Sequence, residues 1–271
     1  MDEIQNQSNL CNLWLKGNHM NIAVIICAAG SSKRFVKEQQ HNLEAAKKKQ
    51  FADVAGRPAF LRSIEFFAGR DNVKQIIMSI PAEDEEMFKI SHGANLSFHG
   101  VKLCIGGAER FETVAKALEL VKDEIDFVAV HDAVRCCLKN EWLDDVFKAA
   151  EKYDAAMLAC PVVATLKKVE KGQIIETIDR TGLYEAQTPQ VFKKDLLKKA
   201  YANLSNLDKS KISDDSQLIE ALGHKVAIVE TDFSNIKITN KADIVIAEAI
   251  IKSRPKPKPQ GPAGAYYEAQ W

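Results

Sequence analysis

The stretch Ile22-Ala-Val-Ile-Ile-Cys27, followed by Ala28-Ala29-Gly30-Ser31-Ser32, decides the fold of this chain. Its first six residues form a continuous apolar run, which is typical of a central parallel strand covered by helices on both faces. The small residues after it predict a tight turn, and Lys33 and Arg34 follow directly. Ligands of open α/β sheets bind beyond the carboxyl ends of the strands. A ligand site is therefore first expected at this turn.

Apolar runs of the same kind recur along the chain and alternate with stretches of helical periodicity. The runs cover residues 75–80, 101–105, 127–130, 155–159 and 225–229, and the helical stretches cover 58–69, 82–90, 110–122, 140–152 and 193–204. Strands that alternate with helices at this spacing indicate βαβ units with right-handed crossovers. The predicted fold is α/β, a Rossmann-like, mostly parallel twisted sheet with helices on both faces.

Three segments fall outside this alternation. Residues 162–180 contain two short strand patterns joined by Glu170-Lys171-Gly172-Gln173, which predicts a protruding β-hairpin arm. Residues 254–271 carry four prolines and little apolar material, so a disordered Pro-rich tail is expected there. Residues 1–20 are expected to form a disordered extension. One domain, residues 21–253, would then contain the whole sheet and the arm.

The composition restricts the classes of function. The chain has 271 residues, and its 37 Lys and Arg balance its 37 Asp and Glu, so no overall field attracts nucleic acid or an anionic membrane. A nucleic-acid partner and a membrane location are therefore not expected, and an anion site must be a local basic cluster. The six cysteines form no CxxC pair, and the first twenty residues do not resemble a secretory signal. Both features favour a reducing, cytoplasmic location.

The turn after the first strand has the residues of a phosphate site. Small residues at 28–30 would let backbone N–H groups approach a polyphosphate, and Arg34 would add a forked cation. A solvated Lys-Arg pair after a tight turn explains the same residues equally well. The motif has one glycine and no GK[ST] sequence, which disfavours a dinucleotide dehydrogenase and a P-loop kinase.

A second motif, His131-Asp132-Ala133-Val134-Arg135, follows the run at 127–130. Asp132 would suit Mg²⁺ or a substrate hydroxyl, and Arg135 would suit a phosphate. Alternatively, Asp132 caps the next helix and Arg135 only neutralises its charge. Because this motif and the turn at 28–30 are expected at the same edge of the sheet, the functional interpretation is favoured.

Two further motifs are each open to two interpretations. Gly106-Gly107 precedes a helical stretch that contains Thr113. Paired glycines let the backbone pass close to a nucleotide base, although they also suit an ordinary turn. Lys237 stands between two apolar neighbours, so it either faces an anionic partner or points to solvent from an edge strand.

Taken in order, these motifs resemble the 2-C-methyl-D-erythritol 4-phosphate cytidylyltransferase family over about residues 21–252. The matching segments are Ala28-Ala29-Gly30 with Arg34, Lys49-Gln50-Phe51, Gly106-Gly107 with Glu109-Arg110, His131 to Arg135, Pro161 to Thr165, Asp179 to Leu183, Gln187 to Phe192, and Asn235-Ile236-Lys237. The run from 179 to 192 is the most specific of them, because a chance match of that length is improbable.

The resemblance implies a role for each matching residue. Arg34, Lys49 and Lys237 would surround the triphosphate of CTP and, with Asp132, would carry catalysis. Asp132 would also hold Mg²⁺. The nucleotide would contact Ala28, Ala29, Gly30, Gly107, Thr113 and Ala133, and the acceptor phosphate would contact Arg135, Thr165, Arg180 and Thr188. In this family the arm reaches across a homodimer, so the residues on the arm would serve the partner's site.

The implied reaction joins a cytidylyl group from CTP to 2-C-methyl-D-erythritol 4-phosphate. The acceptor phosphate attacks the α-phosphorus in line and pyrophosphate leaves, so catalysis rests on positioning and on neutralised charge. No general base is required, because a phosphate monoester is already largely ionised at neutral pH.

Some positions depart from the family and leave alternatives open. Three lysines stand at 47–49 where the family usually has Pro-Lys-Gln, so Lys48 is an alternative to Lys49. Cys136 replaces a usual proline, and the stretch between Arg34 and Lys49 is longer than the family norm. A ribitol 5-phosphate cytidylyltransferase shares the nucleotide motifs. A non-catalytic nucleotide-binding module on the same fold is a second alternative.

Overall fold

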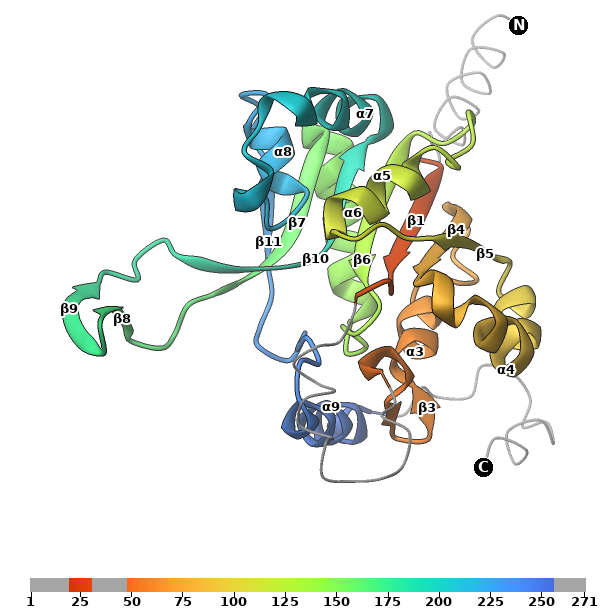
Figure 1. The fold of residues 1–271 in the computed structure, drawn as a ribbon, viewed down its shortest axis with the longest axis horizontal. Coiled ribbons are helices and arrows are strands. Elements are labelled where there is room, and N and C mark those ends of the chain that lie inside the picture. The colour runs from red at the N-terminus through yellow and green to blue at the C-terminus, as the bar shows by residue number, and fades with distance from the viewer. Residues whose placement is uncertain (1–19, 31–47, 256–271) are drawn as a thin grey trace, which may run out of the picture.

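The computed structural model describes residues 20–30 and 48–255 (Figure 1). The disorder expected at 1–20 and 254–271 falls almost entirely outside these ranges and stays a prediction. Arg34 also lies outside the described residues. Within the described ranges, no helix is both long enough and apolar enough to cross a lipid bilayer.

A seven-stranded sheet forms the centre of the fold, in the order β11-β7-β10-β6-β1-β4-β5. Its strands are β1 (Ile22–Cys27), β4 (Val73–Ile80), β5 (Val101–Ile105), β6 (Phe127–Asp132), β7 (Ala155–Pro161), β10 (Tyr184–Lys193) and β11 (Ala227–Glu230). All neighbouring pairs are parallel except those of β10, which runs antiparallel to both β6 and β7. The predicted mostly parallel α/β sheet is confirmed.

Helices cover both faces of this sheet, as Figure 1 shows. They are α3 (Ala59–Glu65), α4 (Glu85–Phe98), α5 (Arg110–Leu118), α6 (Asn140–Tyr153), α7 (Lys194–Ala202), α8 (Ser216–Glu220) and α9 (Lys241–Ser253). Short 3-10 turns lie at Lys49–Phe51, Ala82–Asp84, Asn203–Asn206 and Lys209–Lys211, and a two-stranded ribbon joins β2 (Asp53–Val54) to β3 (Arg57–Pro58).

Strand β1 belongs to two hydrophobic cores at once. Ile22, Val24 and Ile26 pack into the core formed with α3, α4 and α6. Ala23 and Ile25 pack into the core formed with α5, α7 and α8. All five side chains are fully buried, and burial of each large one is worth about 1.5–3 kcal/mol. An apolar run without alternation is therefore what a strand covered on both faces requires.

The predicted hairpin arm is confirmed. It consists of β8 (Leu166–Glu170) and β9 (Gln173–Ile178), and the intervening Lys171 and Gly172 have φ angles of 48° and 81°. Two consecutive residues with positive φ make the tight hairpin turn that matches the twist of the paired strands. The arm projects far from the sheet in Figure 1.

Strand β10 is the strand of the central sheet that the sequence pattern did not predict. Residues 187–192 were recognised as a family motif, yet they form the second half of a ten-residue strand. Gln187, Thr188 and Gln190 are buried polar residues within it, so the apolar pattern of a central strand is interrupted. Hydrogen bonds of their side chains to strand β6 and to two loops replace the missing apolar contacts.

Helix boundaries also differ from the predicted ones. The stretch expected at 82–90 begins with a 3-10 turn, and its α-helix runs from Glu85 to Phe98. Helix α9 was not predicted. It begins at a capping box in which Asn240 and Asp243 exchange side-chain and backbone hydrogen bonds, a motif that satisfies two unpaired N–H groups.

Candidate functional site

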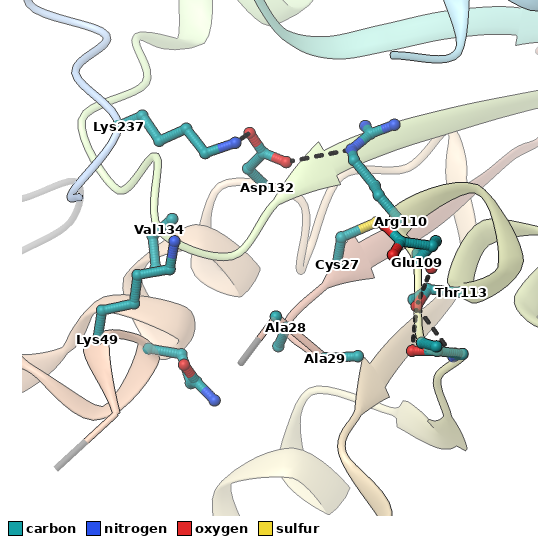
Figure 2. A pocket seen from close by; sticks show the side chains of 14 residues that line it. Cys27, Ala28, Ala29, Lys49, Glu109, Arg110, Thr113, Asp132, Val134 and Lys237 are labelled. Atoms are coloured by element: carbon teal, nitrogen blue, oxygen red, sulfur yellow. Dashed lines mark hydrogen bonds and ion pairs between the residues drawn. The ribbon is translucent and has the colours of Figure 1, made fainter. Parts of the chain in front are cut away.

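A cleft lies at the carboxyl edge of the sheet, where the chain leaves β1, β5 and β6. Strand β4, the next strand of the sheet along the sequence, is the neighbour of β1 on one side, and β6 is its neighbour on the other side. Such a reversal separates the connections that follow the two strands and leaves a crevice for ligands. The cleft is lined by Cys27, Ala28, Ala29, Gly30, Lys49, Gln50, Gly107, Ala108, Glu109, Arg110, Thr113, Asp132, Val134 and Lys237. Figure 2 shows lysines from two separate segments reaching toward it.

Asp132 is the charged centre of this cleft. One carboxylate oxygen lies 2.7 Å from Lys237 Nζ and 3.5 Å from Arg135 Nε, and the other lies 3.7 Å from Arg110 Nε. Burial alone would raise the pKa of Asp132, but the three cations, Lys237 foremost, lower it far below its ordinary value. Asp132 is therefore ionised at every pH at which the protein would work.

A second cleft adjoins the first. It is lined by Arg110, Asp132, Arg135, Ala186, Gln187, Thr188, Gln190, Ser213, Asp214 and Lys237. Arg110, Asp132 and Lys237 line both clefts. The two spaces thus meet at one carboxylate flanked by cations, and two anionic ligands in them would face each other across these three side chains.

Strand β10 and the loop before α9 fix the position of Lys237. The Asn235 side chain donates hydrogen bonds to Gln187 Oε1 (2.8 Å) and to the Thr188 carbonyl (3.1 Å). The backbone N–H of Ile238 donates to the Val134 carbonyl (3.0 Å). Lys237 lies between these two anchors. Its Nζ contacts Asp132. This contact confirms the interpretation in which Lys237 faces an anionic partner.

The structure separates Lys48 from Lys49. Lys48 Nζ lies 2.8 Å from both Glu83 Oε1 and Asp84 Oδ2, at the start of α4. Lys49 begins the 3-10 turn Lys49–Phe51 and lines the cleft. The neighbouring Phe51 ring packs against Phe88 with centroids 4.6 Å apart, which anchors the turn on α4. Two adjacent lysines thus point to different surroundings.

Close packing explains the paired glycines. A Cβ atom on Gly106 would lie 2.3 Å from Ala29 Cβ, and one on Gly107 would lie 2.4 Å from Glu112 Cβ. Neither position therefore tolerates a side chain in this arrangement. The Thr113 hydroxyl accepts a hydrogen bond from the Gly107 N–H (3.0 Å), so the turn after β5 is held against the first turn of α5 and beside the turn after β1.

Cys27 lines the cleft but is poorly suited to act as a nucleophile. Burial raises the pKa of its thiol to about 12, so the sulfur stays protonated at neutral pH. The thiolate is the reactive form of cysteine. The reactive groups of the cleft are therefore its charged side chains, such as Asp132, Lys237 and Arg110, and not the Cys27 thiol.

The sequence model of the 2-C-methyl-D-erythritol 4-phosphate cytidylyltransferase (IspD) family matches residues 22–253. The chain belongs to this family. A family member from Endomicrobium trichonymphae is 42% identical over 86% of this chain and all of its own length, and one from Rhodopirellula baltica is 37% identical over 85% of this chain and 95% of its own.

Solved structures of family members share the fold. The 4-diphosphocytidyl-2C-methyl-D-erythritol synthase from Anaerococcus prevotii has a TM-score of 0.72 at 26% identity, over 87% of this chain and 97% of that one. The 2-C-methyl-D-erythritol 4-phosphate cytidylyltransferase from Thermus thermophilus has a TM-score of 0.68 at 30% identity, over 86% of this chain and all of that one.

The fold gathers most, but not all, of the residues to which the family pattern gives a role. Ala28, Ala29, Gly30, Lys49, Gly107, Thr113, Asp132 and Lys237 line the first cleft, and Arg135 and Thr188 line the second. Ala133 is fully buried and lines neither. Thr165 and Arg180 are exposed on the arm or at its base, away from both clefts.

Arg110 is the cleft residue whose role sequence reasoning missed. It was recognised as part of the family motif after Gly106-Gly107 and was given no function. Its Nη1 lies 2.6 Å from Asp215 Oδ2, a residue 105 positions later in the chain. A cation at the first position of a helix is unfavourable to the helix dipole. This mismatch is the signal in the sequence that could have indicated a tertiary role for Arg110.

Thr188, which lines the second cleft, also holds Asp132 in place. Its hydroxyl accepts a hydrogen bond from the Asp132 backbone N–H (3.0 Å) and lies 3.0 Å from Nδ1 of the buried His131. The pKa of His131 is lowered to about 3 because burial disfavours the charged ring. A neutral imidazole therefore lies beneath the site.

We expect this buried imidazole to make the protein less stable as the pH falls. Below the ordinary pKa of 6.5, the unfolded chain takes up a proton that folded His131 refuses. The free energy of unfolding then falls by up to about 1.4 kcal/mol per pH unit. Replacing His131 with Asn should flatten this dependence between pH 7 and pH 5, as followed by thermal unfolding. Parallel curves for the two proteins would contradict the assignment.

Proposed function

We propose that this chain transfers a cytidylyl group from CTP to 2-C-methyl-D-erythritol 4-phosphate, which yields 4-diphosphocytidyl-2-C-methyl-D-erythritol and pyrophosphate. One observation carries the proposal: two adjoining clefts share Arg110, Asp132 and Lys237 at the carboxyl edge of the sheet, in a chain of the cytidylyltransferase family. The reaction would place the protein in non-mevalonate isoprenoid precursor biosynthesis.

In this proposal the first cleft binds CTP and the second binds the acceptor phosphate. The turn at Ala28–Gly30 and the cations Lys49 and Lys237 would hold the triphosphate. Arg135, whose guanidinium already donates to the Asn235 carbonyl (2.8 Å), would contact the acceptor phosphate. An acceptor oxygen would then attack the α-phosphorus, the bond to the β-phosphate oxygen would break, and pyrophosphate would leave.

Fixed positive charge supplies the rate enhancement in such a reaction. The attacking phosphate, the α-phosphoryl group and the leaving pyrophosphate are all anionic, so their mutual repulsion opposes the reaction. Lys49 and Lys237 reach the cleft from separate segments that folding has already positioned. Donors positioned in advance stabilise charge as it develops without reorganising, and losing one of them typically costs about 10²–10³-fold in rate.

Asp132 is the group that would hold Mg²⁺. The described residues contain no group of three His, Cys, Asp or Glu side chains able to bind a metal. Mg²⁺ is commonly held by one or two carboxylates together with substrate phosphates, and an ionised Asp132 fits that pattern. Bound there, the ion would neutralise charge on the phosphates.

The arm supports the proposal of a homodimer. Val163, Val169, Ile174 and Ile175, on or beside the arm, are each at least half exposed. Contiguous exposed apolar side chains mark interaction surfaces. Because Thr165 and Arg180 lie away from the clefts of their own chain, we propose that a second copy receives this arm and that both residues complete the partner's acceptor site.

Mixing two inactive variants tests the shared site. Lys237→Ala removes a cleft residue and Arg180→Ala removes an arm residue. If the arm serves the partner, each mixed dimer carries one intact site, and random mixing restores about a quarter of the wild-type activity. If the arm serves its own chain, no dimer contains an intact site, and activity does not rise above that of the separate variants.

Pyrophosphate release tests the proposed function as a whole. The purified protein is incubated with CTP and Mg²⁺ and with either 2-C-methyl-D-erythritol 4-phosphate or ribitol 5-phosphate. Release with the first acceptor is expected. Release only with ribitol 5-phosphate would overturn the acceptor assignment, and CTP binding by calorimetry without release with either acceptor would support a non-catalytic module.

A further inference from the structure

Behind the two clefts, a series of side-chain contacts links Tyr201 through Asp215 to Arg110, and Arg110 in turn faces Asp132. The Tyr201 hydroxyl, on α7, donates a hydrogen bond to Asp215 Oδ1 (2.5 Å). Asp215 Oδ2 accepts a hydrogen bond from Arg110 Nη1 (2.6 Å). Arg110 Nε lies 3.7 Å from Asp132 Oδ1. Tyr201 lines neither cleft, yet only two residues separate it from the central carboxylate.

Asp215 is placed where an aspartate would ordinarily cap a helix, and it does not do so. It is the N-cap residue of α8, and its side chain makes no capping hydrogen bond. Gln190 Oε1 instead accepts hydrogen bonds from the backbone N–H groups of Asp215 and Ser216, both at 3.1 Å. Asp214 Oδ1 accepts the next N–H group, that of Gln217 (3.1 Å). Because Gln190 and Asp214 together cap the helix, both oxygens of the buried Asp215 carboxylate are available to Tyr201 and Arg110.

Tyr201 and Arg110, the two donors to Asp215, both keep their protons. Burial, together with the negative charge of Asp215, raises the pKa of Tyr201 far above its ordinary value, so its hydroxyl remains a donor. Burial alone would lower the pKa of Arg110, but the carboxylate charges, Asp215 foremost, raise it above its ordinary value. Tyr201 and Arg110 therefore both remain hydrogen-bond donors toward Asp215.

Two carboxylates compete for the Arg110 guanidinium. Its closest contact goes to Asp215, at 2.6 Å, while Asp132 is left at 3.7 Å. An arginine that lost the first partner would close on the second as a forked ion pair, the arrangement that guanidinium and carboxylate favour. Closure would occupy the Asp132 oxygen that is not already in contact with Lys237 and Arg135.

We propose that Asp215, held in place by Tyr201, is a positioning residue that keeps Arg110 from closing on Asp132, so that Asp132 stays available where the two clefts meet. This inference rests on the proposed function. Neither Tyr201 nor Asp215 was given a role by the family motifs recognised in the sequence. Both act through Arg110, and neither needs to touch a substrate.

The variant Asp215→Asn separates positioning from simple stabilisation. Asparagine keeps the shape of the side chain but removes the charge, and it turns an N–H donor toward either Tyr201 or Arg110. We expect kcat to fall by about tenfold or more, since a charge-assisted hydrogen bond is lost. The KM for CTP should not rise, because Asp215 lines neither cleft and the variant removes a negative charge from behind them. A merely loosened site would raise KM as kcat falls.

A double-mutant cycle provides the decisive measurement. Without the Arg110 guanidinium no arginine can close on the second oxygen of Asp132, so Arg110→Gln/Asp215→Asn should have the same kcat as Arg110→Gln alone. Tyr201→Phe should lower kcat less than Asp215→Asn does, and should have no further effect in the Asp215→Asn background. Losses that simply add would overturn the proposal, because independent sites give additive effects.

Two controls keep the result interpretable. Asp208→Asn removes an exposed carboxylate that contacts Ser210 and Lys211, and it should leave kcat and KM at wild-type values. Thermal unfolding of each variant shows whether the fold is intact. If the wild-type protein releases no pyrophosphate, the proposed function fails. If it does release pyrophosphate and the cycle is additive, only the positioning role of Asp215 fails.

Discussion

Replacing Lys49 with alanine is expected to lower kcat for pyrophosphate release by about 10²–10³-fold while changing the KM for CTP much less. The ammonium group of Lys49 reaches the cleft from a turn anchored on α4. Its charge would interact most strongly with the leaving pyrophosphate, whose negative charge grows as the reaction proceeds. An interaction that is stronger in the transition state than with bound CTP affects kcat more than KM.

The adjacent Lys48 offers a matched control. Lys48→Ala removes the same side chain one position earlier, where it pairs with Glu83 and Asp84 outside the cleft. We expect this variant to keep a kcat close to the wild-type value and to change the free energy of unfolding by about 1 kcal/mol or less. The opposite order, with Lys48→Ala impaired and Lys49→Ala near normal, would show that Lys48 is the catalytic lysine.

Replacing Lys237 with alanine is expected to lower kcat/KM for both substrates by about 10²–10³-fold. Lys237 lines both clefts and lies 2.7 Å from Asp132. Its loss removes a cation from the place where the two anionic substrates would meet. The same change removes the strongest of the charges that lower the pKa of Asp132, so the carboxylate also loses its main partner.

Steady-state kinetics with each substrate varied in turn would measure this loss. Lys225→Ala serves as the control, because it removes the same charge from an exposed position that lines neither cleft. A Lys237→Ala enzyme with an unchanged kcat/KM for one of the two substrates would show that Lys237 serves a single cleft. The shared position argued from the structure would then be wrong.

The sheet was predictable because its strands are buried on both faces. Continuous apolar runs such as 22–27 and 127–130 leave few alternatives to a parallel sheet covered by helices. The arm was predictable from local turn chemistry at Lys171 and Gly172. Strand β10 was not, since its buried polar residues break the pattern and bond to groups that only the folded chain brings near.

The candidate site was predictable only in part, for a related reason. Ala28, Gly107 and Asp132 follow strands, so the topology places them at one edge of the sheet. The ion pair between Arg110 and Asp215 joins residues 105 positions apart, and no local pattern specifies which carboxylate an arginine will choose. Lys48 and Lys49 are identical residues at adjacent positions. Only the direction of the chain at the turn sends one side chain to Glu83 and the other to the cleft.

A crystal structure of the protein soaked with CTP would test the central claim most directly. We expect the triphosphate beside Ala28 to Gly30, within reach of Lys49 and Lys237, and the base beside Gly107. CTP bound outside this cleft would contradict the account. The cavity of about 810 Å³ lined by Arg62, Leu138 and Arg254 offers the nucleotide such an alternative position.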